Sequence, residues 1–415
     1  MLMPPPVSGV AYPTLVGSEE RSNYLSTGLI FNTAYDDNIL AGGSTTPLSD
    51  ETYSIWPTIT VNLTTPRQKR TFTYSPGFTV YQHTSALNAA DQNAALNFQY
   101  RLTEHTTLSV NDLFQKVSNV FNQPNPLSSG AISGSAQAPP TQVIAPYADQ
   151  LNNTANAALS YQFSENGMIG FGGIVTQSSY PNPAQAAGLD NSNSLGGSAF
   201  YTQRLSRTQY VGVTYQYLTS KGTPVYSKLS PVIGPTDVKT HTLLPFYIIY
   251  LNPTLSISVS AGPQHIDATQ SSQPSFLSWT PSATASIAWQ RSSTNIVASY
   301  SRTVTGAAGL PGAFDSSSAH AFVRLQLARN WFLESTGLYA ISKNVTPLFS
   351  PYIPGGHTVS GAVSLDYSMN DHLKAELGYV RLHQSYTGIE VISNAPDSNR
   401  EFISVSYQFT RALGR

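Results

Sequence analysis

REFISVSYQFTRALGR, residues 400–415, contains the pattern that decides the fold. Apolar and small polar side chains alternate along it, the first set being Ile403, Val405, Tyr407 and Phe409 and the second Ser404, Ser406, Gln408 and Thr410. In a β-strand, alternate residues point to opposite faces, so one face is apolar and the other carries uncharged hydroxyls and amides. A soluble sheet would expose charged side chains to water on its polar face. The pattern therefore predicts a strand with lipid on one side and water on the other.

The composition of the 415-residue chain favours the same class. Charged residues make up 10% of it, against about 25% in soluble globular proteins. No run of about 18 apolar residues could form a transmembrane helix. Tyr (24), Phe (17), Gly (29) and Pro (28) are frequent, which is typical of many strands joined by turns. We therefore expect an all-β protein.

Charge and cysteine content exclude several classes of function. The net charge is −1, so electrostatics does not attract the chain to nucleic acid or to an anionic membrane surface. The chain has no cysteine, which excludes a disulfide framework, thiolate zinc sites and cysteine nucleophiles. The absence of cysteine suits passage through an oxidising periplasm.

The N-terminal segment begins MLMPPPVSGVAYP and lacks the basic region and apolar core of a secretory signal peptide. We expect a mobile Pro-rich lead-in at residues 1–22 and a signal peptide that has been removed from this chain. A single transmembrane barrel is expected to follow at residues 23–410, with a short tail at 411–415.

The chain divides into strand pairs joined by short turns, with longer polar loops between the pairs. The short turns include TTPRQK (64–69), TEHT (103–106), SENG (164–167), LSRT (205–208), RSST (291–294), ARNW (328–331) and MNDH (369–372). Eight short turns and nine longer loops predict an up-and-down antiparallel β-barrel of about 18 strands, within a range of 16–20. Both chain ends are then on the short-turn side.

Aromatic residues recur just before the short turns. The strand endings NFQYRLTEH (97–105), SYQFSENG (160–167), SLDYSMNDH (364–372) and SYQFTR (406–411) share this arrangement. We interpret it as an aromatic girdle at one membrane interface. Four prolines, Pro57, Pro76, Pro245 and Pro263, fall inside predicted strands, where the missing N–H interrupts a ladder. We expect β-bulges near the loop-side rim at these positions.

The alternation along nearly the whole chain, the SYQFT ending (406–410) and segments such as SPGFTVYQH (75–83) resemble the porin-like outer-membrane β-barrels of Gram-negative bacteria. The resemblance implies location in the bacterial outer membrane and insertion by the outer-membrane assembly machinery, which reads an aromatic C-terminal strand. Tyr407 and Phe409 fit that signal. TRALGR follows Phe409, however, so a strict terminal-Phe signal is absent.

Two groups of inward-facing residues are candidate pore-lining sites. Charged side chains near the short-turn ends are predicted to ring the inner mouth and tune ion passage, namely Arg101, Arg204, Arg324, Glu334, Lys374 and Glu376. Alternatively, these charges are solvated or paired with neighbours. Trp56, Tyr81 and His83 are predicted to form an inward aromatic patch that could bind sugar rings, or that fills lumen space.

The loop at residues 121–150 is the third long loop, which in general porins folds inward to narrow the channel. Its composition is equally compatible with an external flexible loop. No catalytic site, metal site or cofactor is predicted, because the eight histidines show no HExxH or other close metal spacing. We therefore do not expect an enzyme.

Three functions remain open from the sequence. The first is a channel for passive diffusion of small hydrophilic solutes, with outer-membrane lipid and the assembly machinery as partners and no nucleic acid. The second is a barrel closed or plugged by its loops that serves surface attachment or the binding or export of an extracellular polysaccharide. The third is a soluble β-sandwich or propeller. The sequence does not give the oligomeric state.

Overall fold

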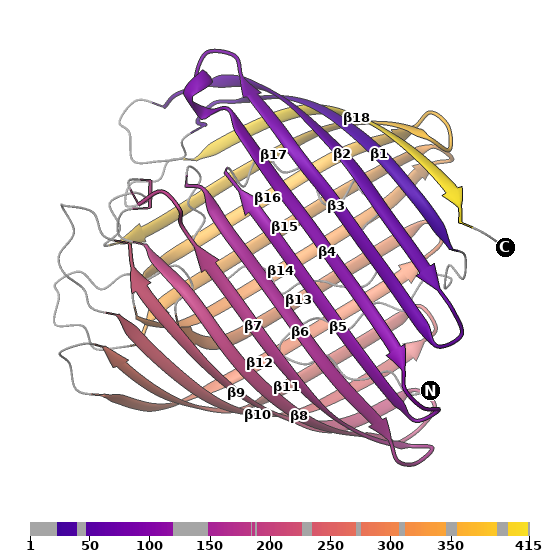
Figure 1. Ribbon diagram of the computed structural model, residues 1–415, viewed down its shortest axis with the longest axis vertical. Coiled ribbons are helices and arrows are strands. Elements are labelled where there is room, and N and C mark those ends of the chain that lie inside the picture. The colour runs from indigo at the N-terminus through magenta and orange to yellow at the C-terminus, as the bar shows by residue number, and fades with distance from the viewer. Residues whose placement is uncertain are drawn as a thin grey trace.

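The protein is a closed β-barrel of tilted antiparallel strands (Figure 1). The computed structural model describes residues 23–39, 47–118, 148–183, 185–186, 189–225, 235–270, 275–306, 312–345, 355–387 and 397–413. Short turns join the strands at one end of the barrel, and the longer connections lie at the other end (Figure 1). We call these the turn side and the loop side.

The structure confirms the predicted up-and-down barrel of 18 strands. The strands are β1 (Tyr24–Asp36), β2 (Asp50–Thr64), β3 (Gln68–Tyr81), β4 (Ala89–Arg101), β5 (Thr106–Val117), β6 (Gln150–Gln162), β7 (Gly167–Ser179), β8 (Asp190–Arg204), β9 (Gln209–Pro224), β10 (Thr236–Asn252), β11 (Leu255–Gln270), β12 (Phe276–Arg291), β13 (Thr294–Gly306), β14 (Ala313–Ala328), β15 (Trp331–Asn344), β16 (Gly355–Ser368), β17 (Leu373–Thr387) and β18 (Ser398–Ala412). A short 3-10 helix, η1 (Ser85–Leu87), lies between β3 and β4. No helix among the described residues is long and apolar enough to cross a membrane.

The first and last strands close the barrel. β1 pairs with β2 on one side and with β18 on the other, in a register that runs from Tyr24↔Ala412 to Asp36↔Arg400. Closure leaves no free sheet edge between the two strands, as required of a sheet that meets lipid. β18 ends at Ala412, two positions beyond the residue 410 expected from the sequence.

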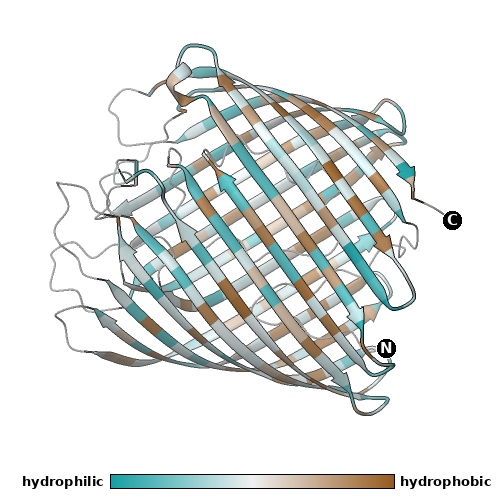
Figure 2. Ribbon diagram, viewed as in Figure 1, coloured by the Kyte–Doolittle hydropathy of each residue, from teal (hydrophilic) through white to brown (hydrophobic). Residues whose placement is uncertain are grey.

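Hydrophobic and hydrophilic residues alternate along much of the strands (Figure 2), and the exposure of their side chains separates an apolar outer face from a more polar inner face. On β1, the large side chains of Leu29, Phe31 and Tyr35 are 43%, 49% and 48% exposed, whereas Asn32 and Ser26 on the opposite face are buried. The same alternation continues through every strand pair because directly opposed residues share a face. At the turn-side ends, aromatics of the predicted girdle stand on the outer face, where Tyr161, Tyr407 and Phe409 are 46%, 50% and 46% exposed.

Aromatic side chains on the inner face lie flat over glycines of the neighbouring strand. A Cβ atom added at Gly77 would stand 2.3 Å from the ring of Trp56, and one at Gly378 would stand 2.3 Å from the ring of Phe402. Glycine leaves the space that each ring occupies. These pairs hold bulky side chains against the wall instead of across the lumen.

The predicted bulges at the strand prolines are wrong. β2 and β3 pair Ile55 with Phe78 and Ile59 with Tyr74, so the register is the same on both sides of Pro57 and Pro76. β10 and β11 likewise keep one register across Pro245. These prolines interrupt the ladder pairing locally but insert no extra residue, because they fall on the outward-facing positions of strands that remain held by their other neighbour.

Candidate functional site

The inner wall of the barrel is the candidate site. It carries hydroxyl pairs that bridge neighbouring strands, with oxygen–oxygen distances of 2.8 Å for Ser194–Ser220, 2.7 Å for Ser258–Ser286 and 2.8 Å for Ser301–Ser318. Asn111 donates through Nδ2 to Oδ1 of Asn156 at 3.0 Å on the same face. These side chains are polar and uncharged, so they can replace the hydrogen bonds of a hydrophilic solute without attracting one sign of ion.

The six predicted charged residues all lie on inward-facing positions near the turn side, but they do not form an even ring. Arg324 and Glu334 face each other on β14 and β15, and Lys374 and Glu376 lie on β17. Arg101 on β4 and Arg204 on β8 stand apart from this group. Four of the six residues come from strands β14–β17, which are consecutive in the wall, so the charges are concentrated on one side of the predicted ring.

The cluster on β14–β17 contains an ion pair and one acid that the sequence analysis missed. Nε of Arg324 is 2.9 Å from Oε1 of Glu334, whose side chain is 2% exposed. The Arg324 guanidinium also lies 4.5 Å from the centroid of the Phe332 ring. Asp366 stands opposite Glu376 in the register and is 9% exposed. Strand alternation from Ser364 would have identified Asp366 as inward-facing.

Two of the three residues of the predicted aromatic patch lie on the inner wall. Trp56 and Tyr81 lie on the inner face and are 0% and 3% exposed, respectively. β3 ends at Tyr81, so His83 belongs to the following connection and not to the inner face of the strand. Its side chain is 70% exposed, and its Nδ1 lies 3.0 Å from Oδ1 of Asp50.

A hairpin formed by the loop-side ends of β13 and β14 folds into the lumen. β12 and β13 pair only from Arg291↔Thr294 to Ala283↔Arg302, and β13 then leaves its neighbour. Val304 instead packs with Val238, Ile266 and Ala268 of the inner faces of β10 and β11. We call residues 303–306 and 313–316 the inner hairpin.

Pro281 explains why the hairpin separates from β12. The N–H of Gln290 donates to the Thr254 carbonyl on the β11 side, so the N–H groups of odd-numbered β12 residues point toward β13. Continuing the register would place Pro281 opposite Val304, where proline has no N–H to donate. The ladder therefore ends there.

Gln264 of β11 takes over the lost pairing. Its Oε1 accepts a hydrogen bond from the Val304 N–H at 2.8 Å, and its Nε2 donates to the Val304 carbonyl at 2.9 Å. The Gln264 side chain is 2% exposed, so both bonds are shielded from water. One side-chain amide thus satisfies the two backbone groups of Val304, which have no partner on β12 once β13 has left it.

An apolar cluster joins opposite walls at the loop side of the interior. Phe314 of the inner hairpin packs in one buried cluster with Tyr180 and Leu189, which flank the β7–β8 connection, and with Tyr386 of β17. β17 stands nine places from β8 in the ring of 18 strands, so the cluster spans the lumen. Sequence alternation gave no indication of this contact, because it links residues far apart in the chain.

Most of the 121–150 loop, for which an inward and an external position were both predicted, lies outside the described residues. Ala148, near the end of that loop, is described and belongs to the apolar cluster. Residues 1–22, 414 and 415 are also outside the described residues. No group of three or more His, Asp or Glu side chains in the described part of the chain is arranged to hold a metal ion.

No protein-family model and no curated protein matches the chain. Among solved structures, the unliganded ferric citrate transporter FecA is 12% identical with a TM-score of 0.46, over 94% of this chain and 64% of that one, so this chain spans less than two thirds of the transporter. Pseudomonas aeruginosa OprD is 11% identical with a TM-score of 0.43, over 97% of this chain and 100% of that one. Pseudomonas aeruginosa OccK2 (OpdF) in complex with glucuronate is 9% identical with a TM-score of 0.45, over 94% and 98% of the two chains.

Proposed function

We propose that the protein spans the bacterial outer membrane and lets small hydrophilic solutes diffuse through its interior. The observation that carries the proposal is the closed 18-strand wall with an apolar outer face and a hydroxyl-lined inner face. An outer face of Leu, Ile, Phe and Tyr is stable against hydrocarbon, and an inner face of Ser, Thr and Asn is stable against water. A barrel of this strand number is wide enough to hold water.

The inner hairpin and the charged cluster supply selectivity in this proposal. The inner hairpin narrows the path on the β9–β11 side, and a solute must pass Arg324 and Glu334 on the β14–β15 side. Insertion by the outer-membrane assembly machinery, with the β18 aromatics as its signal, is part of the same proposal.

Reconstitution tests the proposal directly. Purified protein in planar bilayers should give steady open-channel current, and liposomes that contain it should swell in isotonic solutions of small neutral sugars. Larger neutral sugars should act as blockers without permeating. Tight seals together with non-swelling liposomes, from protein that migrates as a folded heat-modifiable barrel, would contradict a channel.

The apolar cluster favours a second candidate function. Because Phe314, Tyr180 and Tyr386 join opposite walls, the loop side of the described interior is partly occluded. A permanently closed barrel would serve surface attachment or the binding or export of an extracellular polysaccharide. A tight seal that becomes conducting in a Phe314→Ala variant would identify the cluster as the closure and support this candidate for the native chain.

A further inference from the structure

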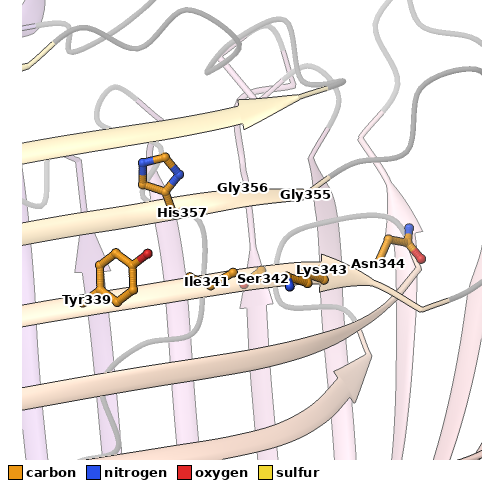
Figure 3. A pocket seen from close by; sticks show the side chains of 8 residues that line it. All are labelled: Tyr339, Ile341, Ser342, Lys343, Asn344, Gly355, Gly356 and His357. Carbon is orange, nitrogen blue, oxygen red and sulfur yellow. The ribbon is translucent and has the colours of Figure 1, made fainter.

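A pocket of about 350 Å³ opens on the outer face near the loop-side ends of β15 and β16 (Figure 3). Its lining comprises Tyr339, Ile341, Lys343, Gly355 and His357 together with the alternate positions Ser342, Asn344 and Gly356. Gly356 stands opposite Tyr386, whose ring is in the interior cluster. Tyr339, Ile341, Lys343 and His357 therefore face away from the lumen, and Tyr339 is 45% exposed.

Basic side chains gather around this pocket. Lys343 and His357 line it, and the His357 ring lies 5.3 Å from the ring of His383 on β17. Arg381 is on the same outward face of β17, two positions before His383, and its side chain is 57% exposed. We call Lys343, His357, Arg381 and His383 the basic rim.

Asp397 and Asp315 border the basic rim, and each has partners of its own. Asp397 accepts hydrogen bonds from Arg381 and, at 2.6 Å, from Nδ1 of His383. The hydrogen bond from His383, with a further one from Arg381, holds the pKa of Asp397 below its usual value. Asp315, opposite Lys343 in the register, pairs with Arg302 at 2.7 Å.

Lys343 consequently stands without an ion-pair partner in the part of the chain that the structure describes. Arg381 pairs with Asp397 and Arg302 pairs with Asp315, and Glu401 of β18 stands opposite Tyr379 on the same outward face, so Lys343 is the cation that an anion in the pocket would meet. The pocket is thus complementary to an anion.

On the turn side of the pocket, the outward face of the wall carries glycine and other small residues. Gly337 of β15 and Gly361 of β16 are directly opposed on the outward face, and Ala321 of β14 stands opposite Gly337 on the other side. A Cβ added at Gly337 would meet no heavy atom within 4 Å, and one at Gly361 would meet its nearest neighbour at 3.8 Å. Exposed Val359 and Val363 border this low strip. A hydrocarbon chain can approach the backbone closely there.

We propose that this outer face binds a phosphate-bearing lipid, with its phosphate at the basic rim and an acyl chain over Gly337 and Gly361. The proposal rests on the membrane placement in the proposed function, but not on conduction. Cationic side chains at the edge of an apolar belt lie at headgroup depth and attract anionic headgroups. Along the barrel axis, the strip at Gly337 and Gly361 lies toward the turn side, and the pocket with its basic rim lies toward the loop side. A lipid has the same order, with its acyl chain on one side and its phosphate on the other.

Native mass spectrometry of the full chain in detergent tests the lipid class. Phosphatidylglycerol should bind the folded barrel at a lower lipid concentration than phosphatidylcholine does. The double variant Lys343→Gln, His357→Gln should reduce the ratio of the two affinities at least fivefold. Lys239→Gln is the matched control, since Lys239 also faces outward near the loop side but stands opposite Asp267. Equal binding of the two lipids, or loss in the control as large as in the double variant, would overturn the proposal.

Two further measurements distinguish a lipid-binding site from a site that binds free phosphate. Inorganic phosphate at the same concentration should leave phosphatidylglycerol bound, and complete displacement would contradict the role of the acyl chain. Gly337→Leu should weaken lipid binding by filling the strip, whereas Gly173→Leu, at another open outward position of the barrel, should not. A protein that needs no detergent would instead refute the membrane placement itself.

Discussion

Asp112 is a charged residue on the outward face of the barrel wall. It stands on β5 between Leu96 of β4 and Ala155 of β6, and both of these neighbours face outward. An acidic side chain on the lipid face of a barrel costs free energy that depends on its depth. The position therefore gives a direct test of which face meets lipid.

Replacing Asp112 with leucine should increase the free energy of unfolding in lipid bilayers by about 1 to 2 kcal/mol, because the carboxylate no longer has to be accommodated in hydrocarbon. Urea titration in liposomes measures the change. Asn111→Leu is the control, since Asn111 faces the lumen and would lose its hydrogen bond with Asn156. Stabilisation by Asn111→Leu with destabilisation by Asp112→Leu would mean that the two faces are assigned the wrong way round.

Reversing the charges of Arg204 and Arg324 together should shift single-channel selectivity toward cations, because both side chains face the lumen near its turn-side mouth. The reversal potential in a salt gradient measures the shift.

Arg324→Glu alone should also lower the free energy of unfolding, since it places a second acid against Glu334, which is 2% exposed. Arg204→Glu should change selectivity with little loss of stability, and an unchanged reversal potential in the double variant would count against pore lining.

Among the strands, the packing of Trp56 over Gly77 predicts a position-specific cost. Gly77→Ala should lower the free energy of unfolding by about 1 to 3 kcal/mol, because the new methyl group overlaps the indole ring and the ring is held on the wall. Gly28→Ala, also inward, is the control, because its nearest neighbour would be at 3.6 Å, an ordinary contact. Equal unfolding midpoints for the two variants would show that Trp56 can move aside.

The inner hairpin depends on one glutamine. Gln264→Leu should leave the N–H and carbonyl of Val304 unpaired, which costs about 1 to 3 kcal/mol for each buried group. The hairpin should then leave the β10–β11 wall, and the single-channel conductance should rise. Gln216→Leu, at an inward position of β9, tests whether loss of any lumen amide has this effect. Conductance that is unchanged in Gln264→Leu would show that the hairpin does not narrow the path.

The number of strands, and the face of the sheet on which each side chain lies, could be predicted from the sequence. Alternation of apolar and polar residues is a local property that repeats through the chain. The end of β3 at Tyr81, and hence the exposed place of His83, depends on where pairing with β2 stops. The inner hairpin could not be predicted from the sequence. Pro281 disrupts the pairing of β12 with only one of its two neighbouring strands, and the register decides which of them it is. Contacts such as Phe314 with Tyr386 require the barrel to be closed before they can be seen.

In the molecule as a whole, charges on the inner wall are segregated along the barrel axis. The loop-side inner wall carries Asp36, Asp50, Asp91, Asp190 and Arg400, and the turn-side inner wall carries Lys69, Arg101, Arg204, Arg324, Lys374, Glu334, Asp366 and Glu376. The first set is acidic on balance and the second is basic. Ions crossing the barrel would therefore meet a field that differs between the two mouths.

This segregation predicts rectification. The current–voltage curve should be asymmetric in about 0.1 M KCl, where the Debye length is about 10 Å, and nearly symmetric in 1 M KCl, where it is about 3 Å. Measurement on single oriented channels compares the two salts. A curve that is equally asymmetric in both would attribute rectification to shape and not to charge.

The seam between β1 and β18 has a consequence for chain connectivity. The N–H of Leu413 donates to the carbonyl of Asn23 at 2.8 Å, so the two ends of the described wall are adjacent on the turn side. A short linker could join them, and the chain could be reopened at the turn near residues 65–67 without removing a strand. Such a circular permutant should keep the heat-modifiable migration of the parent barrel. The order of the strands around the ring, and not the position of the chain ends, would then define this protein.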